Sequence, residues 1–437
     1  MSIFRAYDIR GIYRKDLTNE IAFKIGKALG TFLKGGEEVC VGHDTRNGSK
    51  KIAKSFCSGL ASTGCDVTFL GLTATPILYF YAWKNRIFGS MITASHNPKE
   101  WTGFKFVKPN GTSFLDELQK LKEIFEKEDF LEGRGEISNK NPLTDYKNFI
   151  KEILGRVEGK VGVECFGGAG VSGIEVLEDL GLQIFPLHPR PDENFFGFER
   201  PEPAGKNLKS LKNIVKKRKL DFGVAFDGDA DRSVFVDDKG NELNGSIISA
   251  IFIEEILKKE KGKIILTADC ASELKKIVEK FGGELIWWRV GHGFIEKKCI
   301  EEKALFAGEQ SSHFYFNYIY PFSDGILATA QLAKILNERD EKLSKILNRI
   351  KLHPTEKIYI STKNDEKKIE VIEELKKEIP EAISMMDGIK IELNDIEWVL
   401  IRASQTLPEI NICAEGRNKR RLKAIIEKYT KIIKEKL

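Results

Sequence analysis

Three acidic residues stand at alternate positions in the segment FDGDADR, 226–232. Asp227, Asp229 and Asp231 follow an apolar stretch that is typical of a buried strand. Carboxylates at this spacing favour a hard cation such as Mg²⁺, and Arg232 beside them favours a phosphate group. An EF-hand has the same beginning, but its sixth position is glycine and here it is Arg232. A metal-free acidic turn is the simpler alternative, and we favour the metal site because all three carboxylates follow one strand.

A serine follows another strand-like run in the segment ITASHNPKEWTGFKF, 92–106. An ordinary surface turn is one explanation, because Ser, Asn and Pro are turn-forming residues. A hydrolase triad is disfavoured because no G-x-S-x-G segment surrounds Ser95, and His96 would project away from Ser95 if the backbone is extended. With Lys105 nearby, we predict instead that Ser95 carries a phosphoryl group, since this chemistry depends mainly on positioning and charge neutralisation.

Two further polar segments could bind a sugar phosphate. In an extended GEQSSH segment (308–313), Glu309, Ser311 and His313 would share one face and suit paired sugar hydroxyls. The segment RASQTLPE (402–409) offers the guanidinium, hydroxyl and amide donors of a phosphate cradle: Arg402, Ser404, Gln405 and Thr406. Taken alone, the first segment could equally be a polar strand end, and the second is a weak signal because Ser/Thr-rich turns are common.

A histidine lies between two glycines in the segment VGHGF, 290–294. Lone histidines are more often structural than catalytic. His292, however, follows a predicted strand and precedes a predicted helix, which makes it a candidate for proton transfer. Arg289, just before this segment, is a further candidate for substrate binding.

These segments occupy equivalent places in a repeated pattern of strands and helices. Strand-like runs at 38–44, 66–70 and 87–92 alternate with helix-like runs, and the same order recurs over 160–226 and 263–307. Such alternation indicates βαβ units, whose ligands lie at the carboxyl ends of strands. We therefore expect an α/β protein: three similar mixed α/β sheet domains followed by a C-terminal α+β domain. The expected domains are 1–148 (serine loop), 149–246 (metal loop), 247–352 (sugar loop) and 353–437 (phosphate loop).

Composition limits the possible partners and compartments. The 70 basic and 65 acidic residues give a net charge of +5 that is spread along the chain, so no nucleic-acid partner is expected. No apolar stretch approaches the roughly 20 residues that span a bilayer, and the first residues do not resemble a signal peptide. The seven scattered cysteines suit reduced thiols. We expect a cytoplasmic protein with no membrane contact, either a monomer or a homodimer.

Taken together and in this order, the motifs resemble the α-D-phosphohexomutase family, and within it the bacterial and archaeal phosphomannomutase/phosphoglucomutase group. Any one motif could arise by chance, but the ordered set from residue 4 to residue 408 is specific. The matching segments are FRAYDIRG (4–11), GHDTR (42–46), TASHNP with GFK (93–98, 103–105), FDGDADR (226–232), VGHGFI (290–295), GEQSSH (308–313) and RASQTLP (402–408).

The resemblance implies a heart-shaped molecule with a central cleft. It implies interconversion of hexose 6-phosphate and hexose 1-phosphate, of mannose and/or glucose, through a phosphoserine and a hexose 1,6-bisphosphate that also acts as activator. Mg²⁺ would be held by Asp227, Asp229, Asp231 and an oxygen of phosphorylated Ser95. Lys105, Arg232 and His292 would be catalytic with Ser95. The implied substrate-binding residues are Tyr7, Arg10, His96, Arg289, Glu309, Ser311, His313, Arg402, Ser404, Gln405 and Thr406.

Some residues depart from the family pattern. Ser312 replaces a common glycine, Thr102 and Gln405 replace asparagines, and Asp269 stands where relatives carry a basic residue. Phosphoglucosamine mutase is the alternative within the family, and a Mg²⁺-dependent sugar phosphatase is the alternative outside it. A non-catalytic sugar-phosphate binding protein would not need Ser95 or Lys105.

Overall fold

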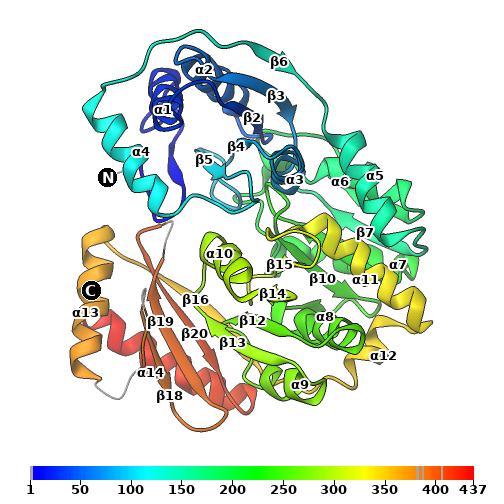
Figure 1. Ribbon diagram of the computed structural model, residues 1–437. Helices are drawn as coiled ribbons and strands as arrows, with labels where there is room; N and C mark the ends of the chain where they lie inside the picture. The colour runs from blue at the N-terminus through cyan, green and yellow to red at the C-terminus, as the bar shows by residue number, and fades with distance from the viewer. Residues whose placement is uncertain (1–2, 380–382, 386–387, 405–406) are drawn as a thin grey trace.

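The computed structural model describes residues 3–379, 383–385, 388–404 and 407–437 and arranges them in four sheets with their helices, here called units 1 to 4 (Figure 1). Unit 1 contains β1 (Ile9–Ile12), α1 (Asn19–Phe32), β2 (Glu38–His43), α2 (Ser49–Ala61), β3 (Asp66–Leu72), α3 (Thr75–Asn85), β4 (Phe88–Ile92), β5 (Trp101–Val107), α4 (Asp116–Lys127), β6 (Ile137–Asn139) and α5 (Leu143–Leu154). Unit 2 contains β7 (Lys160–Glu164), α6 (Val171–Asp179), β8 (Gln183–Leu187), two 3₁₀ turns (Phe195–Gly197 and Gly205–Leu208), α7 (Lys209–Arg218), β9 (Phe222–Phe226), β10 (Ser233–Asp237) and β11 (Glu242–Leu243).

Unit 3 contains α8 (Gly245–Lys259), β12 (Lys263–Thr267), α9 (Leu274–Lys280), β13 (Glu284–Trp288), α10 (His292–Glu302), β14 (Phe306–Gly308), β15 (Phe314–Tyr315), α11 (Gly325–Arg339) and α12 (Leu343–Leu347). Unit 4 contains β16 (Thr355–Ser361), α13 (Asp365–Glu378), β17 (Ile383–Met385), β18 (Gly388–Glu392), β19 (Trp398–Ala403), β20 (Glu409–Glu415) and α14 (Lys419–Lys434).

Units 1 to 3 share one four-strand arrangement, which confirms the expected repeat. Each has a central strand with parallel strands on both sides: β3-β2-β4, β8-β7-β9 and β13-β12-β14. In each, a fourth strand pairs antiparallel with the third: β5 with β4, β10 with β9 and β15 with β14. The serine, metal and sugar segments are therefore the same connection in three copies, between the third and the fourth strand.

Unit 4 is different, as the sequence predicts. Its five strands, in the order β16-β20-β19-β18-β17, are antiparallel throughout. The candidate phosphate segment joins β19 to β20. Helices α13 and α14 begin with asparagine caps, because Asn364 and Asn418 each accept a hydrogen bond from the backbone three residues on.

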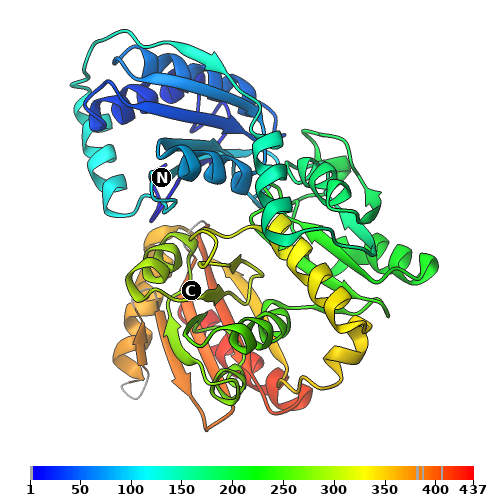
Figure 2. The ribbon, with the colours of Figure 1, turned by 45° about the vertical axis from the view of Figure 1, so that its right-hand side comes forward.

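The units lie in an arc that brings unit 4 back beneath unit 1, as Figures 1 and 2 show. Residues 148 and 246, where two of the expected domains end, lie inside α5 and α8. A helix is a continuous element, so we propose boundaries just before these helices, which moves α5 from unit 1 to unit 2. All seven cysteines are buried and unpaired.

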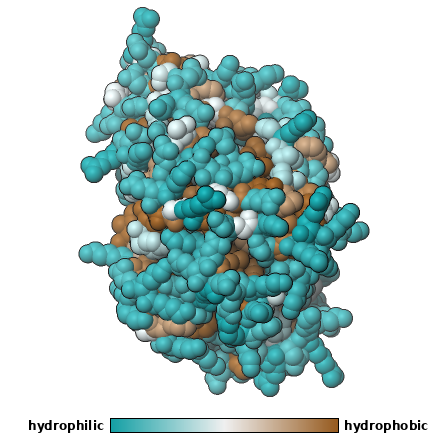
Figure 3. Space-filling view, turned by 90° about the vertical axis from the view of Figure 1, so that its right-hand side faces the viewer, coloured by the Kyte–Doolittle hydropathy of each residue, from teal (hydrophilic) through white to brown (hydrophobic). Residues whose placement is uncertain are grey.

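The face of the molecule in Figure 3 carries mostly hydrophilic side chains, with smaller apolar areas between them. Among the described residues, no helix is both long and apolar enough to pass through a bilayer.

Candidate active site

All four units contribute to one central cleft, with a cavity of about 90 Å³. Its lining contains most of the predicted site residues. These are Tyr7, Arg10, Ser95, His96 and Lys105 from unit 1, Asp231 and Arg232 from unit 2, His292, Glu309, Ser311 and His313 from unit 3, and Arg402 and Ser404 from unit 4. Gln405 and Thr406 lie outside the described residues, and Arg289 is not part of the lining: its guanidinium lies 3.7 Å from the ring centre of Phe294.

Ser95 is held in a strained loop conformation. Its φ is 49°, in the left-handed region that non-glycine residues rarely occupy, and its backbone N–H donates to Thr93 Oγ1 at 2.9 Å. The backbone is therefore not extended, and the expectation that His96 projects away is wrong: His96 Nδ1 lies 3.2 Å from Ser95 Oγ. Burial lowers the pKa of His96 well below its ordinary value, so this imidazole is neutral near pH 7.

Two arginines hold the serine loop in place through hydrogen bonds to its backbone. Arg46 donates to the carbonyl oxygens of Ser95 and Asn97, and also to those of the neighbouring residues 98 and 101. Arg10 donates to Ala94 O at 3.2 Å and to Asn97 Oδ1 at 2.9 Å. Planar guanidinium groups can serve several acceptors at once, so these residues hold the loop's backbone as one rigid piece.

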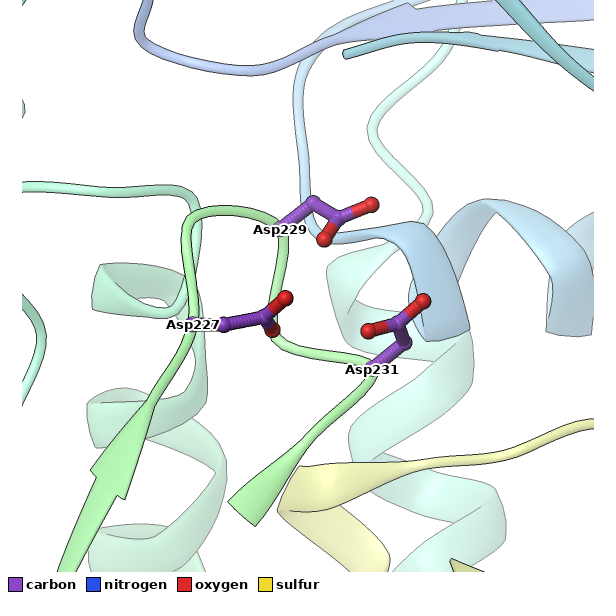
Figure 4. Close-up of side chains that lie close together, drawn as sticks. All are labelled: Asp227, Asp229 and Asp231. Atoms are coloured by element: carbon purple, nitrogen blue, oxygen red, sulfur yellow. The ribbon is translucent and has the colours of Figure 1, made fainter. Parts of the chain in front are cut away.

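The three aspartates converge, and Figure 4 shows their carboxylates near one another on the loop that joins β9 to β10. One oxygen from each of Asp227, Asp229 and Asp231 lies within 4.8 Å of the others. Ser95 Oγ donates to Asp227 Oδ2 at 2.5 Å, which places the serine at the edge of this cluster. Burial and the charges of the other two carboxylates raise the pKa of Asp227 to about 7.

Close backbone contact joins the serine loop to the metal loop. A Cβ at Gly228 would lie 2.3 Å from the carbonyl oxygen of Ser95, so no side chain fits there. Asp229 is also tied to unit 1, because the Thr75 hydroxyl donates to its Oδ2 at 2.6 Å.

The aspartate cluster fits a metal ion. Its donors are hard oxygens on buried side chains, and Asp229 Oδ1 has no hydrogen-bond partner in the described part of the chain. Lys105 Nζ lies 2.7 Å from Asp229 Oδ2 and 2.6 Å from Asp231 Oδ2, so its ammonium partly balances the cluster. Burial alone would lower the pKa of Lys105, but these carboxylates raise it above its ordinary value.

The sugar segment corrects one expectation. It is a turn and not an extended segment, because Ser312 has a φ of 68° and its N–H donates to Glu309 O at 3.0 Å. The turn still brings the predicted side chains together: His313 Nδ1 lies 3.1 Å from Glu309 Oε1 and 3.0 Å from Ser311 Oγ. Burial opposes ionisation of Glu309, but His313 and the Tyr315 hydroxyl lower its pKa to about 2. A permanently ionised Glu309 can accept hydrogen bonds from sugar hydroxyls.

His313 also connects the sugar turn to the metal loop. Its Nε2 lies 3.3 Å from Asp231 Oδ1 and 3.2 Å from Arg232 Nε. Arginine can only donate, so this nitrogen accepts from Arg232 when the ring is neutral and donates to Asp231 when the ring is charged. Burial lowers the pKa of His313, but the carboxylates of Glu309 and Asp231 outweigh this effect and raise the pKa to about 9.

His292 is the first residue of α10, close to the predicted helix start. Gly291 before it has a φ of 129°, which a side chain would resist. The ring of His292 contacts the edge of Tyr7, with 4.5 Å between ring centres. Burial lowers the pKa of His292 well below its ordinary value, and its Nε2 has no partner among the described residues. A neutral imidazole with a free nitrogen in the cleft can exchange a proton with a ligand.

A buried lysine orders the described part of the phosphate segment. Lys368 on α13 donates to Ser404 O at 2.8 Å, to Leu407 O at 2.9 Å and to Asp365 Oδ1 at 2.6 Å. Asp365 in turn binds Arg5 of unit 1, with 2.9 Å between Oδ2 and Nη1.

Sequence reasoning missed several residues of the cleft and its supports. Arg46 lies in the motif GHDTR, so its place in a matching segment was a usable signal. Lys368 shares the buried face of α13 with Val371, Ile372 and Leu375, so a lysine at the helical spacing of an apolar stripe was the usable signal there. The lining also contains residues outside every motif, which only the folded chain brings together: Arg200, Glu202, Lys357, Tyr359 and Asn411.

A loop-bound serine beside a buried carboxylate cluster, with several cations and a neutral imidazole, defines a site for phosphoryl transfer. The comparisons agree with this class. Family models described as "Phosphoglucomutase/phosphomannomutase, alpha/beta/alpha" domains I, II and III match residues 1–132, 144–240 and 244–352. The chain belongs to the phosphoglucomutase/phosphomannomutase family, which confirms the predicted α-D-phosphohexomutase resemblance and the four-domain fold.

Similar proteins match over nearly the whole chain. A protein of Methanosarcina acetivorans named a probable phosphoglucosamine mutase is 34% identical over 100% of both chains. The phosphomannomutase/phosphoglucomutase of Pseudomonas aeruginosa is 33% identical and covers 97% of this chain and 94% of its own. A solved phosphoglucomutase/phosphomannomutase family structure from Burkholderia thailandensis has a TM-score of 0.89 at 28% identity, with 99% and 97% coverage.

Proposed function

We propose that the protein is a mutase that moves phosphate between O6 and O1 of a hexose, through a phosphorylated Ser95 and a hexose 1,6-bisphosphate. The observation that carries this proposal is the position of Ser95 Oγ, 2.5 Å from Asp227 in the carboxylate cluster and inside the four-unit cleft. The family membership and the names of similar proteins support the reaction type.

The chain's own residues account for each part of the reaction. Asp227, Asp229 and Asp231 would hold Mg²⁺, which would supply charge neutralisation to the transferring phosphoryl group when bound. Arg232, at the cleft edge of the cluster, would bind the oxygens of that group. Lys105 keeps its charge and is better suited to electrostatic stabilisation than to proton removal.

His292 is the better candidate for taking the proton of the attacking hydroxyl, because its imidazole is neutral and its Nε2 has no hydrogen-bond partner among the described residues. Glu309 and Ser311 would bind sugar hydroxyls, with Glu309 Oε2 making no hydrogen bond in the described ranges. The segment containing Arg402 and Ser404 would bind the phosphate that is not reacting. The narrow four-unit cleft would limit the access of water to the phosphoserine, which favours a mutase over a phosphatase.

The preferred sugar is mannose or glucose, with the phosphoglucosamine mutase as the alternative. Glucose and mannose differ only at C2, and the sugar turn is placed to bind other hydroxyls. Similar proteins carry both kinds of name.

A coupled mutase assay tests the proposal. The protein is given Mg²⁺, a trace of hexose 1,6-bisphosphate, and mannose 1-phosphate, glucose 1-phosphate or glucosamine 1-phosphate. Comparable turnover of the first two, well above the third, is expected. Faster turnover of glucosamine 1-phosphate would assign the alternative sugar, and release of inorganic phosphate at the rate of sugar consumption would indicate a phosphatase instead.

A further inference from the structure

Two cations in the cleft have no part in the mechanism above: Lys357 on β16 of unit 4 and Arg200 on a loop of unit 2. Neither forms an ion pair with any residue of the described chain. In the same cleft, Arg10, Lys105 and Arg232 each pair with an aspartate. Unpaired positive charges on the wall of a small cavity create a potential that favours an anion.

Both cations lie near the same acidic residue of unit 4. Burial raises the pKa of Glu409, the charges of Arg200 and Lys357 oppose this effect, and the charge of Glu202 adds to it. Arg200 of unit 2 and Lys357 of unit 4 therefore line the same end of the cavity, beside the carboxylates of Glu202 and Glu409.

The rest of the lining also indicates a ligand at this end. Unit 3 contributes no lysine or arginine to the described lining. Asn411 lines the cavity and is only 5% exposed, yet its Oδ1 has no hydrogen-bond partner among the described residues. This oxygen can only accept a hydrogen bond, so its burial is costly unless a donor satisfies it, such as a hydroxyl group of the sugar that carries the phosphate.

We infer that Lys357 and Arg200 bind the substrate phosphate that is not being transferred, from opposite sides of the cleft. This inference rests on the proposed function. A phosphate monoester carries nearly two negative charges at neutral pH, more than the guanidinium of Arg402 alone balances. Because either phosphate of the bisphosphate intermediate must occupy this end in turn, both cations serve hexose 1-phosphate and hexose 6-phosphate equally.

The test compares Lys357→Met, Arg200→Met and the charge-conserving Lys357→Arg. Loss of one charge-assisted contact costs on the order of tenfold in affinity or more. Each Met variant should raise KM about tenfold for glucose 1-phosphate and for glucose 6-phosphate alike, while kcat changes little. Lys357→Arg should restore most of the affinity. Lys363→Met is the matched control, because Lys363 is an exposed lysine of the same unit outside the lining.

An unchanged KM, a loss in kcat alone, or a rise in KM for only one of the two substrates would overturn the inference. If the wild-type protein turns over no hexose phosphate, the proposed function fails and the site is tested separately. Calorimetry with inorganic phosphate then compares the wild type with Lys357→Met. Weaker binding by the variant supports the phosphate site, and equal binding overturns it.

Discussion

At the scale of single residues, the proposed chemistry depends on one hydroxyl group. Ser95 Oγ lies at the edge of the carboxylate cluster and is nearly completely buried. Ser95→Ala removes the phosphate acceptor and leaves the sugar and phosphate contacts in place. We expect kcat to fall by about 10³-fold or more, while calorimetry shows hexose phosphate binding with little change.

The matched control is Ser361→Ala, an exposed serine at the end of β16, which should keep wild-type turnover. Full activity of Ser95→Ala would assign the nucleophile to another residue.

A buried carboxyl outside the metal loop predicts a pH effect on stability. Glu296 on α10 is 1% exposed and accepts from Ser113 N at 2.7 Å. Burial raises its pKa to about 7, from the model-peptide value of 4.5. The folded state therefore binds this proton more tightly than the unfolded state does. The resulting stabilisation of the folded state is complete below pH 4.5 and is lost as the pH rises to about 7.

Glu296→Gln keeps the acceptor and cannot ionise. Its melting temperature should exceed that of the wild type at pH 7.5, and the difference should shrink towards pH 5. The corresponding change in the free energy of unfolding is up to about 3 kcal/mol over this range. Glu301→Gln, exposed on the same helix, should show no such pH-dependent difference. A gap between Glu296→Gln and wild type that does not change with pH would contradict the assignment.

At the scale of elements, the serine loop depends on a residue from another part of its unit. Arg46, after β2, supports the serine loop after β4 through four carbonyl oxygens. Lysine keeps the charge but cannot reproduce the guanidinium fork. Arg46→Lys should lower kcat at least about tenfold with little change in KM, because the loop positions the nucleophile and does not bind the sugar.

Steady-state kinetics measure this split, and circular dichroism shows whether the variant is folded. Arg156→Lys, at an exposed position, serves as the control. A rise in KM with unchanged kcat would show that Arg46 acts on substrate binding instead.

Much of this arrangement could be predicted from the sequence because it is local. Buried parallel strands such as Phe222–Phe226 are short apolar runs, and polar residues after them mark the loops. The antiparallel fourth strands are less visible, since β15 has two residues and β5 includes Lys105. Loop conformation was also hidden: positive φ at Ser95 and Ser312 depends on contacts with other segments. Arg200 and Lys357 come from different units and share no local pattern.

At the scale of the whole molecule, all four units meet around a narrow cleft. Its cavity of about 90 Å³ is below the roughly 300 Å³ at which typical ligand pockets begin, so we expect the units to move apart when a hexose phosphate enters. One direct link between the ends of the arc is the Arg5–Asp365 ion pair, which joins unit 1 to unit 4. Asp365 also binds Lys368, which holds the phosphate segment, so closure and phosphate binding share one connected set of contacts.

Removing this link should shift the protein towards an open form. The pair is partly exposed, and such pairs contribute about 0.5–1 kcal/mol, so its loss lowers the ratio of closed to open molecules two- to fivefold. Arg5→Gln should therefore raise KM by a similar factor and increase the radius of gyration in small-angle X-ray scattering, with saturating hexose phosphate restoring the compact value. Lys24→Gln, which breaks the Lys24–Glu128 pair inside unit 1, is the matched control and should change neither quantity. If Arg5→Gln has the wild-type radius and the wild-type KM, the Arg5–Asp365 link does not control closure. The contact between units 3 and 4, where Lys390 of β18 donates to Ala268 O at 3.1 Å, would then be the next one to test.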